Sequence, residues 1–229
     1  MAFLAKIFES DTKNFHAWSY RVWLVERFQL WQGELDFCNK LMDEDIYNNS
    51  LWSYRYFLLS RSPAGTYPGV TGTPGSPEFV AKELDILMNH RIPQKVDNEA
   101  SWVYLRGLLC TTQKEEDESS KKKIKRVFMG RFKAQLEPFL ATQAETARQD
   151  PRQRGLRFIL QCQSDMALAD GDPAAATKLM EELRDSADRI RSNYWQWKIN
   201  RLQSQRLLAV IVDELERLQE QGERPGVAS

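Results

Sequence analysis

The stretch Asp11-Thr-Lys-Asn14-Phe-His-Ala-Trp18-Ser-Tyr20-Arg21 recurs as Asp45-Ile-Tyr-Asn48-Asn-Ser-Leu-Trp52-Ser-Tyr54-Arg55, with every shared residue displaced by 34 positions. A period of this length corresponds to one helical hairpin and is typical of α-solenoids, in which each hairpin buries its apolar face against its neighbours. The repeat therefore predicts an all-α protein, folded as an α-α superhelix of antiparallel helical hairpins.

Two further copies are more divergent. One runs from Asn98 to Leu108 and keeps a Trp four residues after its Asn, and the other has Trp195 seven residues after Asp188. Asn, Trp and Arg at i, i+4 and i+7 fall on one face of a helix. We expect the Asn to cap the helix start, the Trp to pack between neighbouring hairpins, and the Arg to hydrogen-bond carbonyls or an adjacent loop. These structural framework residues are Asn14, Trp18, Arg21, Asn48, Trp52, Arg55, Asn98, Trp102 and Trp195.

The sequence between the copies has helical periodicity and lacks β-alternation with turn chemistry. Two helix starts carry a capping residue followed by Pro, at Ser76-Pro77 and Asp172-Pro173. Further helices are predicted over 34–43, 131–148, 153–169, 172–185 and about 193–220.

Two segments interrupt the repeat without dividing the chain. Residues 62–78 hold four Pro and four Gly, which predicts an exposed insertion and accounts for the delayed third copy. Residues 113–126 form a run of acidic and then basic charges, predicted to be a charged loop. We therefore expect a single α-solenoid domain over 1–229.

Composition excludes several classes of protein. The 32 Lys and Arg balance the 32 Asp and Glu, whereas a dedicated nucleic-acid binder would be basic. No apolar run approaches the roughly 20 residues that span a bilayer, so no membrane insertion is expected. Three separated cysteines, Cys38, Cys110 and Cys162, suggest no disulfide framework and a reducing compartment, the cytoplasm or the nucleus. We take the cytoplasm as the expected location.

Chemistry-bearing motifs are scarce. The chain has two histidines and no metal-binding or phosphate-loop pattern, so we expect no metal site made by this chain alone. His16 follows the expected cap Asn14 by two positions, at the positive end of a helix dipole where a phosphate would be stabilised. Taken from the residues alone, a surface or packing role for His16 is the stronger interpretation.

The repeats resemble those of the protein prenyltransferase α subunit, most closely the α subunit shared by protein farnesyltransferase and protein geranylgeranyltransferase type I. The resemblance is carried by 13–18, 28–35, 44–45, 48–52, 55–57, 98–108, 190–191 and 194–195. It implies an enzyme active only as a heterodimer with a β subunit. That enzyme transfers a farnesyl or geranylgeranyl group from an isoprenoid diphosphate to the cysteine of C-terminal CaaX motifs.

The resemblance also implies where the chemistry lies. Zn²⁺ is expected in the partner β subunit and Mg²⁺ with the diphosphate, with no cofactor bound by this chain alone. His16 aligns with the family histidine that approaches the isoprenoid diphosphate, so the resemblance reverses the interpretation from the residues alone. Phe15 stands where the family commonly has a Tyr, so that hydroxyl is missing here. No catalytic residue is assigned in this chain.

The family α subunit has further repeats before the point where this sequence begins, one with a Lys and a Tyr associated with diphosphate activation. We therefore expect an N-terminally truncated α subunit. Three alternatives remain: a non-catalytic, tetratricopeptide-like protein-binding scaffold, an α subunit of Rab geranylgeranyltransferase, and a form that binds β without activity. The large Trp, Tyr and Arg residues at the hairpin contacts disfavour the tetratricopeptide alternative, which usually has small residues there.

Overall fold

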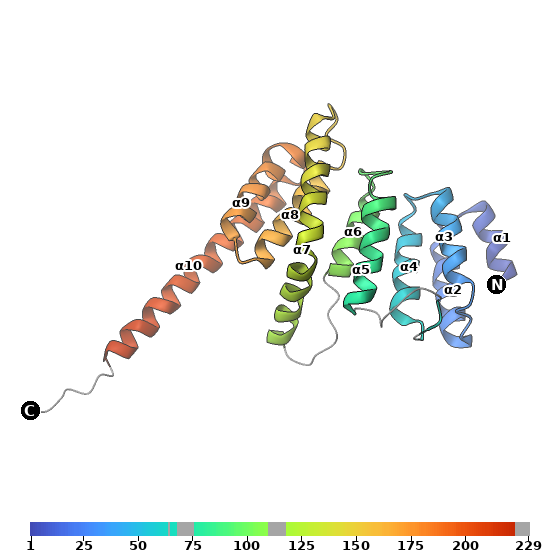
Figure 1. The fold of residues 1–229 in the computed structure, drawn as a ribbon, viewed down its shortest axis with the longest axis horizontal. Coiled ribbons are helices and arrows are strands. Elements are labelled where there is room, and N and C mark those ends of the chain that lie inside the picture. Colours follow the sequence, from blue (N-terminus) through green and yellow to red (C-terminus); the bar gives the residue numbers. More distant parts are fainter. Residues whose placement is uncertain (64, 68–75, 110–117, 223–229) are drawn as a thin grey trace, which may run out of the picture. The chain divides into compact units, whose positions relative to one another are not determined.

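The computed structural model describes residues 1–63, 65–67, 76–109 and 118–222. Within these ranges the regular elements are all helical, so the predicted all-α class is confirmed (Figure 1). The chain divides into two compact units, Met1–Cys162 and Gln163–Ser229, and the division falls within α8 (Leu156–Ala169). The prediction of a single solenoid domain stays a prediction.

The first unit is a row of helical hairpins. Its helices are α1 (Ala2–Ser10), α2 (Phe15–Phe28), α3 (Glu34–Glu44), α4 (Asn49–Arg61), α5 (Pro77–Ile86) with the π-helical turn η1 (Leu87–Arg91), α6 (Glu99–Leu109) and α7 (Glu118–Gln149). Helix α1 packs against α2, α3 against α4, and α5 against α6. In addition α2 packs against α4 and α4 against α6, so the second helices of successive hairpins lie side by side.

The second unit is smaller. It contains the end of α8, α9 (Pro173–Glu182), the π-helical turn η2 (Leu183–Ala187), the short η3 (Arg189–Arg191) and α10 (Ser192–Gly222). The first part of α10 packs against α9 and η2. Its remaining length continues well past α9 (Figure 1).

Side-chain caps fix where the helices begin, as the sequence predicts. Asn14 accepts a hydrogen bond from the Ala17 backbone N–H at 2.9 Å, and Asn48 accepts one from Ser50 at 3.0 Å. The expected caps Ser76 and Asp172 do the same for α5 and α9, each followed by Pro at the first helical position. Each cap satisfies a backbone donor that the helix cannot, which is worth about 1 kcal/mol.

Several predicted boundaries differ from the structure. The helix expected from residue 153 begins at Leu156, because Gln153 and Gly155 have φ of 47° and 78° and left-handed residues cannot continue an α-helix. Helix α9 ends at Glu182, and the next residues form the π-helical turn η2.

The two predicted interruptions lie partly outside the described residues. Of the 62–78 insertion, residues 64 and 68–75 are not described, and α5 already begins at Pro77. Of the charged loop, residues 113–117 are not described. Residues 118–126 belong to α7, so this part of the expected loop is helical.

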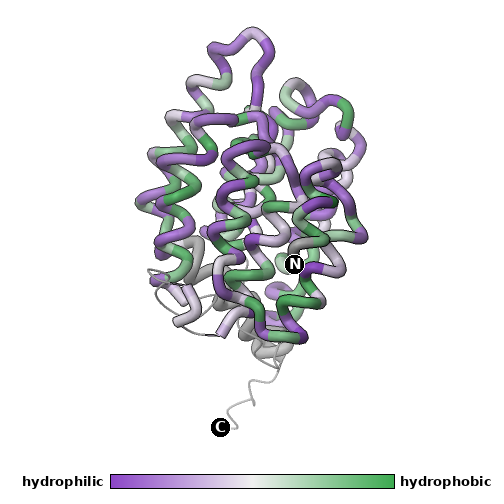
Figure 2. Tube along the Cα trace, turned by 90° about the vertical axis from the view of Figure 1, so that its right-hand side faces the viewer, coloured by the Kyte–Doolittle hydropathy of each residue, from purple (hydrophilic) through white to green (hydrophobic). Residues whose placement is uncertain are grey.

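Several helices of the first unit bury one apolar face, as α3 does with Cys38 and Met42 and α5 with Phe79, Val80 and Leu84. Figure 2 shows this as green segments recurring between purple ones along the helices. The centre of the first unit is built from leucines with no exposed area, among them Leu58, Leu84, Leu105, Leu136 and Leu160. Among the described helices, none is long and apolar enough to cross a membrane.

Candidate functional site

The tryptophans of the repeat fix each helix to the turn that precedes it. The indole N–H of Trp18 donates to the Thr12 carbonyl at 2.8 Å, and Trp52 donates to Ile46 at the same distance. Trp102 repeats the bond to a carbonyl six residues earlier. The polar edge of each buried indole is therefore satisfied by the turn at the start of its own helix.

The same carbonyls also bind the next hairpin. The Asn48 side-chain amide donates to the Thr12 carbonyl at 3.0 Å, and the Asn98 amide donates to Ile46 at 2.7 Å. A carbonyl oxygen has two lone pairs, so each one accepts from the Trp of its own hairpin and the Asn of the following one. This arrangement, here named the turn row, places the starts of α2, α4 and α6 along one edge of the first unit.

The arginines of the repeat pair with carboxylates, not with carbonyls or loops as we expected. Arg21 makes two hydrogen bonds to Glu34 of 2.7 and 2.8 Å, and the Tyr54 hydroxyl donates to the same carboxylate. The side chains of Arg21 and Glu34 are only 5% and 7% exposed. A guanidinium removed from water needs a fixed counter-charge, and the next hairpin supplies it.

The second hairpin contact repeats this Arg–Glu–Tyr triad. Arg55 bonds Glu83 at 2.6 and 2.9 Å, and the Tyr104 hydroxyl donates to Glu83 at 2.6 Å. Burial raises the pKa of Tyr54 and of Tyr104 well above the ordinary value, and the neighbouring carboxylate raises the pKa of each further. Both phenols therefore stay protonated as donors and serve the framework.

Cys38 is excluded as a nucleophile by its surroundings. The residue has no exposed area, and burial raises the pKa of its thiol to about 12. Because the thiolate is the reactive form, a thiol with this pKa is inert near neutral pH.

His16 lies in the first turn of α2, with its side chain exposed. The equivalent positions of the next two hairpins hold Ser50 and Ala100, so the repeat framework does not require a histidine here. The Phe15 ring is 74% exposed and meets the His16 ring edge-on at 5.7 Å. The first turn of α2 holds no acidic residue that would repel an anion.

Lys13 precedes this turn but is directed to the next hairpin. Its ammonium lies 3.3 Å from the Asp45 carboxylate, and both side chains are partly exposed. The start of α2 thus offers an exposed imidazole and a positive helix end. Both groups can donate hydrogen bonds to a phosphate.

A groove lies between α4 and α6 on the exposed face of the first unit. Its volume is about 260 Å³, and its lining is Asn49, Trp52, Ser53, Tyr56, Ala100, Val103, Tyr104 and Gly107. Tyr56 is 39% exposed and Val103 53% exposed. Apolar side chains left open along two neighbouring helices form a surface suited to packing against another protein.

No group of three or more His, Cys, Asp or Glu suited to a metal ion is present among the described residues. Of the framework residues, those from Asn14 to Trp102 belong to the turn row or the Arg–Glu–Tyr triads. Trp195 belongs to the second unit, where its indole donates to the Asp188 carboxylate at 2.8 Å.

The sequence analysis missed the acidic partners of the arginines. Glu34 follows its Arg by 13 residues and Glu83 follows its Arg by 28, because the insertion separates the second pair. It predicted helices over 131–148 and 153–169 but recognised no copy of the repeat at the turn between them, where there is no Trp. A usable signal was Asp150, which accepts from the backbone N–H two residues later as Asp11 and Asp45 do, at 3.0 Å in all three cases.

Comparisons with known proteins agree on one family. Residues 1–28 and 31–62 match the protein prenyltransferase alpha subunit repeat, which confirms the resemblance seen in the sequence. No curated protein matches the sequence.

Among 21 matching chains of solved structures, one comes from Candida albicans protein geranylgeranyltransferase-I complexed with GGPP. It is 27% identical with a TM-score of 0.62, and the match covers 87% of this chain and 57% of that one. The likeness confirms the α-α superhelix. This chain spans little more than half the length of the solved chain.

Proposed function

Because the chain carries repeats of the protein prenyltransferase α-subunit family, we propose that it is the α subunit of a heterodimeric protein prenyltransferase. The proposed enzyme transfers a farnesyl or geranylgeranyl group from its diphosphate to the cysteine of a C-terminal CaaX motif. The observation that carries the proposal is the family match over 1–28 and 31–62, which contains the first two hairpins and the first Arg–Glu–Tyr triad.

His16 has a specific task in this proposal. When the cysteine sulfur bonds to the isoprenoid carbon, the carbon–oxygen bond breaks and diphosphate leaves with its negative charge. Donors already in place where this charge develops lower the barrier. The exposed His16 imidazole and the positive start of α2 would supply such donors from this chain. Zn²⁺ that activates the thiol would belong to the β subunit, as the resemblance implies.

The groove between α4 and α6 is the proposed contact for the β subunit. It opens on the helices whose starts lie in the turn row, so a partner seated there would be close to the start of α2. Aromatic and apolar side chains exposed along neighbouring helices are typical of such interfaces.

The proposal is tested by co-expressing the chain with a farnesyltransferase or a type I geranylgeranyltransferase β subunit. The complex is assayed for transfer from each isoprenoid diphosphate to a CaaX peptide. We expect a stable complex and transfer with at least one pair. If the chain forms no complex with either β subunit, the proposed function is wrong.

In an active complex, His16→Ala should reduce kcat/KM for the isoprenoid diphosphate by about 10-fold or more, since one donor to a developing charge is lost. The KM for the peptide should change little. Ser50→Ala is the matched control, because Ser50 holds the same repeat position in the next hairpin. Equal kinetics for the His16 variant and the control would remove His16 from the site.

The non-catalytic alternative remains a distinct outcome. The chain spans 57% of the solved chain it matches, so a complex with β that forms but does not turn over would favour a binding role. Cytoplasmic location likewise stays part of the proposal.

A further inference from the structure

Helices α1 and α2 stand at the end of the row of hairpins in the first unit (Figure 1). Helix α2 packs against α4, and α4 packs in turn against α6, so α4 lies between two helices of its own kind. Three positions of α2 and its cap have close counterparts in α4 and its cap, which therefore show how these positions are covered when a hairpin precedes them. The pairs are Asn14 with Asn48, Tyr20 with Tyr54, and Trp23 with Phe57.

On α4 these positions are buried by the first hairpin. The Tyr54 ring lies 5.0 Å from the Trp18 ring and is 2% exposed. The Tyr54 hydroxyl donates to Glu34, the residue that begins α3. The Asn48 amide, which has no exposed area, donates to a carbonyl of the preceding turn at 3.0 Å. An indole, a carbonyl and a carboxylate thus satisfy the ring and the two polar groups.

The third hairpin makes the same contacts with the second. The Tyr104 ring lies 5.3 Å from the Trp52 ring and is 6% exposed, and its hydroxyl donates to Glu83. The Asn98 amide donates to the Ile46 carbonyl at 2.7 Å and is 2% exposed. The interface between hairpins is therefore a recurring structure with a fixed set of partner groups.

On α2 the same groups are open. Tyr20 and Trp23 are each 50% exposed, and no acceptor for the Tyr20 hydroxyl or the Asn14 amide is found among the described residues. The rings of Tyr20 and Trp23 are nonetheless stacked, with their centroids 5.6 Å apart. The rings of Tyr54 and Phe57 on α4 are stacked likewise at 5.8 Å. The exposed pair thus already has the arrangement that the corresponding pair has beneath a preceding hairpin.

The recurring interface identifies the partner that these open groups fit. The partner must present an indole to the Tyr20 ring, a turn carbonyl to the Asn14 amide, and a carboxylate to the Tyr20 hydroxyl. We propose that Asn14, Tyr20 and Trp23, here named the α2 docking face, bind a helical hairpin of this same repeat type. A glutamate follows the second helix of that hairpin, as Glu34 follows α2. The proposal does not rest on the proposed function, because it involves neither a β subunit nor an isoprenoid.

Two other occupants fit the α2 docking face less well. In a twofold contact between two copies of this face, each group would meet the same surface patch of the second copy. The Asn14 amide and the Tyr20 hydroxyl would then face their own counterparts instead of the carbonyl and carboxylate that these groups bind elsewhere in the repeat. Helices that lie on anionic membranes carry Lys and Arg along their polar face. The exposed charged residues of α2 are one acid and one base, Glu26 and Arg27.

The experiment supplies such a hairpin by fusing a copy of residues 1–34 directly ahead of Met1 of the full chain. Glu34 of the copy then stands 20 residues before Tyr20, the separation that Glu34 and Tyr54 have in the first triad. If the α2 docking face binds the copy, the helix formed by residues 15–28 of the copy is held in place. We expect its amides to exchange with solvent at least about 1,000-fold more slowly than those of an unfolded chain.

The variant Tyr20→Ala, made only in the original segment, should lower this protection by about 100-fold, because a buried aromatic ring is lost from the contact. Phe15→Ala is the matched control, since Phe15 corresponds to Asn49, which stays exposed although a hairpin precedes it. It should change the protection by less than about 3-fold. In the unmodified chain Tyr20→Ala should lower the thermal midpoint by less than about 3 °C, because the side chain is exposed there.

The proposal is overturned if the amides of the copy are unprotected, or if Tyr20→Ala and Phe15→Ala lower their protection equally. The unmodified chain tests the other occupants. A dimer seen by sedimentation at micromolar concentration and dissociated by Trp23→Ser would assign the α2 docking face to a second copy. Binding to phosphatidylserine vesicles that Trp23→Ser abolishes would assign it to a membrane. Either result would contradict the proposal.

Discussion

Arg21 and Arg55 each bring a positive charge into the interior, where their side chains are almost completely buried. Each is neutralised by a glutamate of the following hairpin, and a tyrosine hydroxyl completes the carboxylate's hydrogen bonds. Breaking such a pair leaves one buried charge without a partner, which costs more than the intact pair contributes. The Arg–Glu–Tyr triads therefore act mainly by fixing which hairpins meet and in what register.

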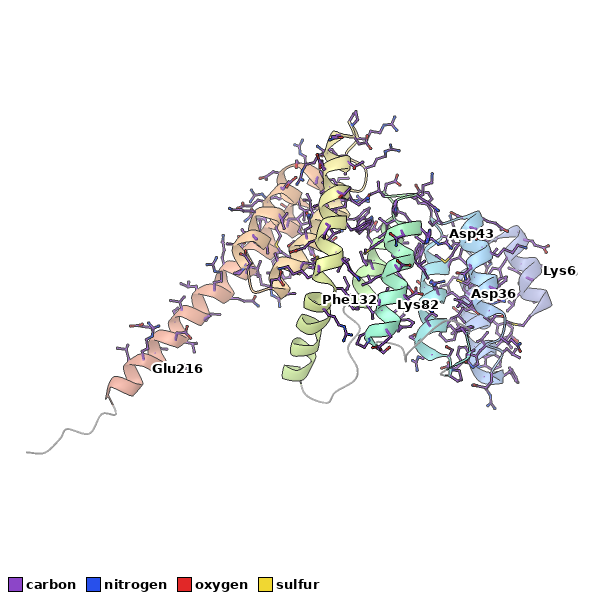
Figure 3. The ribbon with its side chains drawn as sticks, viewed as in Figure 1. Lys6, Asp36, Asp43, Lys82, Phe132 and Glu216 are labelled. Carbon is purple, nitrogen blue, oxygen red and sulfur yellow. The ribbon has the colours of Figure 1, made fainter. Side chains whose placement is uncertain are left out.

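This view predicts a large effect from a small change. Glu34→Gln keeps the size of the side chain but leaves the buried Arg21 unpaired, and should lower the free energy of unfolding by about 3 to 5 kcal/mol. Asp43→Asn removes an ion pair of similar length, 2.6 Å to Arg91, but the Asp43 side chain is 66% exposed (Figure 3). We expect a loss below about 1 kcal/mol there. Urea unfolding curves compare the two, and similar losses would contradict this account.

Gly155 gives a second prediction at this scale. Its φ is 78°, and a Cβ at this position would lie 2.4 Å from the Val96 carbonyl oxygen. Gly155→Ala should therefore destabilise the protein by about 3 kcal/mol or more, since it adds a backbone clash to the cost of a left-handed alanine. Gly171→Ala has the same φ of 78° with nothing within 4 Å, and should cost only about 1 to 2 kcal/mol. Equal shifts in thermal midpoint would show that the close approach to Val96 is unimportant.

At the scale of the element, one side chain of the turn row, that of Asn48, has two functions. Asn48 caps α4 and also donates to the Thr12 carbonyl of the preceding turn. Asn48→Ala removes both bonds from a side chain with no exposed area, and should cost about 2 to 3 kcal/mol. Asn14→Ala removes a cap of the same kind, for which no second hydrogen bond to another hairpin is found among the described residues, and should cost about 1 kcal/mol. Chemical denaturation distinguishes the two, and equal losses would mean that the bond between hairpins adds nothing.

The helices and their starts could be read from the sequence because local chemistry decides them. The capping roles of Asn14, Asn48, Ser76 and Asp172 are confirmed, since a cap needs only a polar side chain and the next turn of backbone. The prediction that Trp18 packs between hairpins is also confirmed, because its ring lies 5.0 Å from that of Tyr54.

The features that could not be predicted from the sequence are mainly contacts between residues that lie far apart in the chain. The partner of Arg55 is Glu83, beyond an insertion whose length breaks the period, so no fixed spacing revealed it. The copy of the repeat between α7 and α8 was not recognised because Gln153 and Arg157 stand after Asp150 where the first two copies have Asn and Trp. The role of His16 is still a prediction, since its ring is exposed and its described ring contact is with Phe15, which is also exposed.

At the scale of the whole molecule, buried acids set the response to alkaline pH. The pKa values of Tyr54 and Tyr104 are raised by burial, and that of Cys38 is raised to about 12. In the unfolded chain these groups lose their protons near their ordinary pKa values of about 8.5 to 10. The folded chain keeps them to higher pH, so stability is full below about pH 8 and falls as pH rises.

The expected loss approaches about 1.4 kcal/mol per pH unit for each group once its unfolded form has ionised. Denaturation midpoints between about pH 7 and 10.5 measure it. The variant Tyr54→Phe/Tyr104→Phe should be less stable at neutral pH but show a shallower decline. A midpoint that does not fall between pH 8 and 10.5 would contradict the burial of these acids.

Because the contacts of the turn row recur with the 34-residue repeat of the first two hairpins, a hairpin could be inserted or duplicated without changing them. Tyr20 holds the position of Tyr54 in the repeat but is 50% exposed. If residues 15–48 were duplicated in tandem, the second Tyr20 would face the first Glu34, and the first Asn48 would cap the added helix. Every bond at the new junction would copy one that already exists. The protein could thus be lengthened in steps of 34 residues. An inserted segment of 33 or 35 residues would shift the repeat positions out of register, so these bonds could not form.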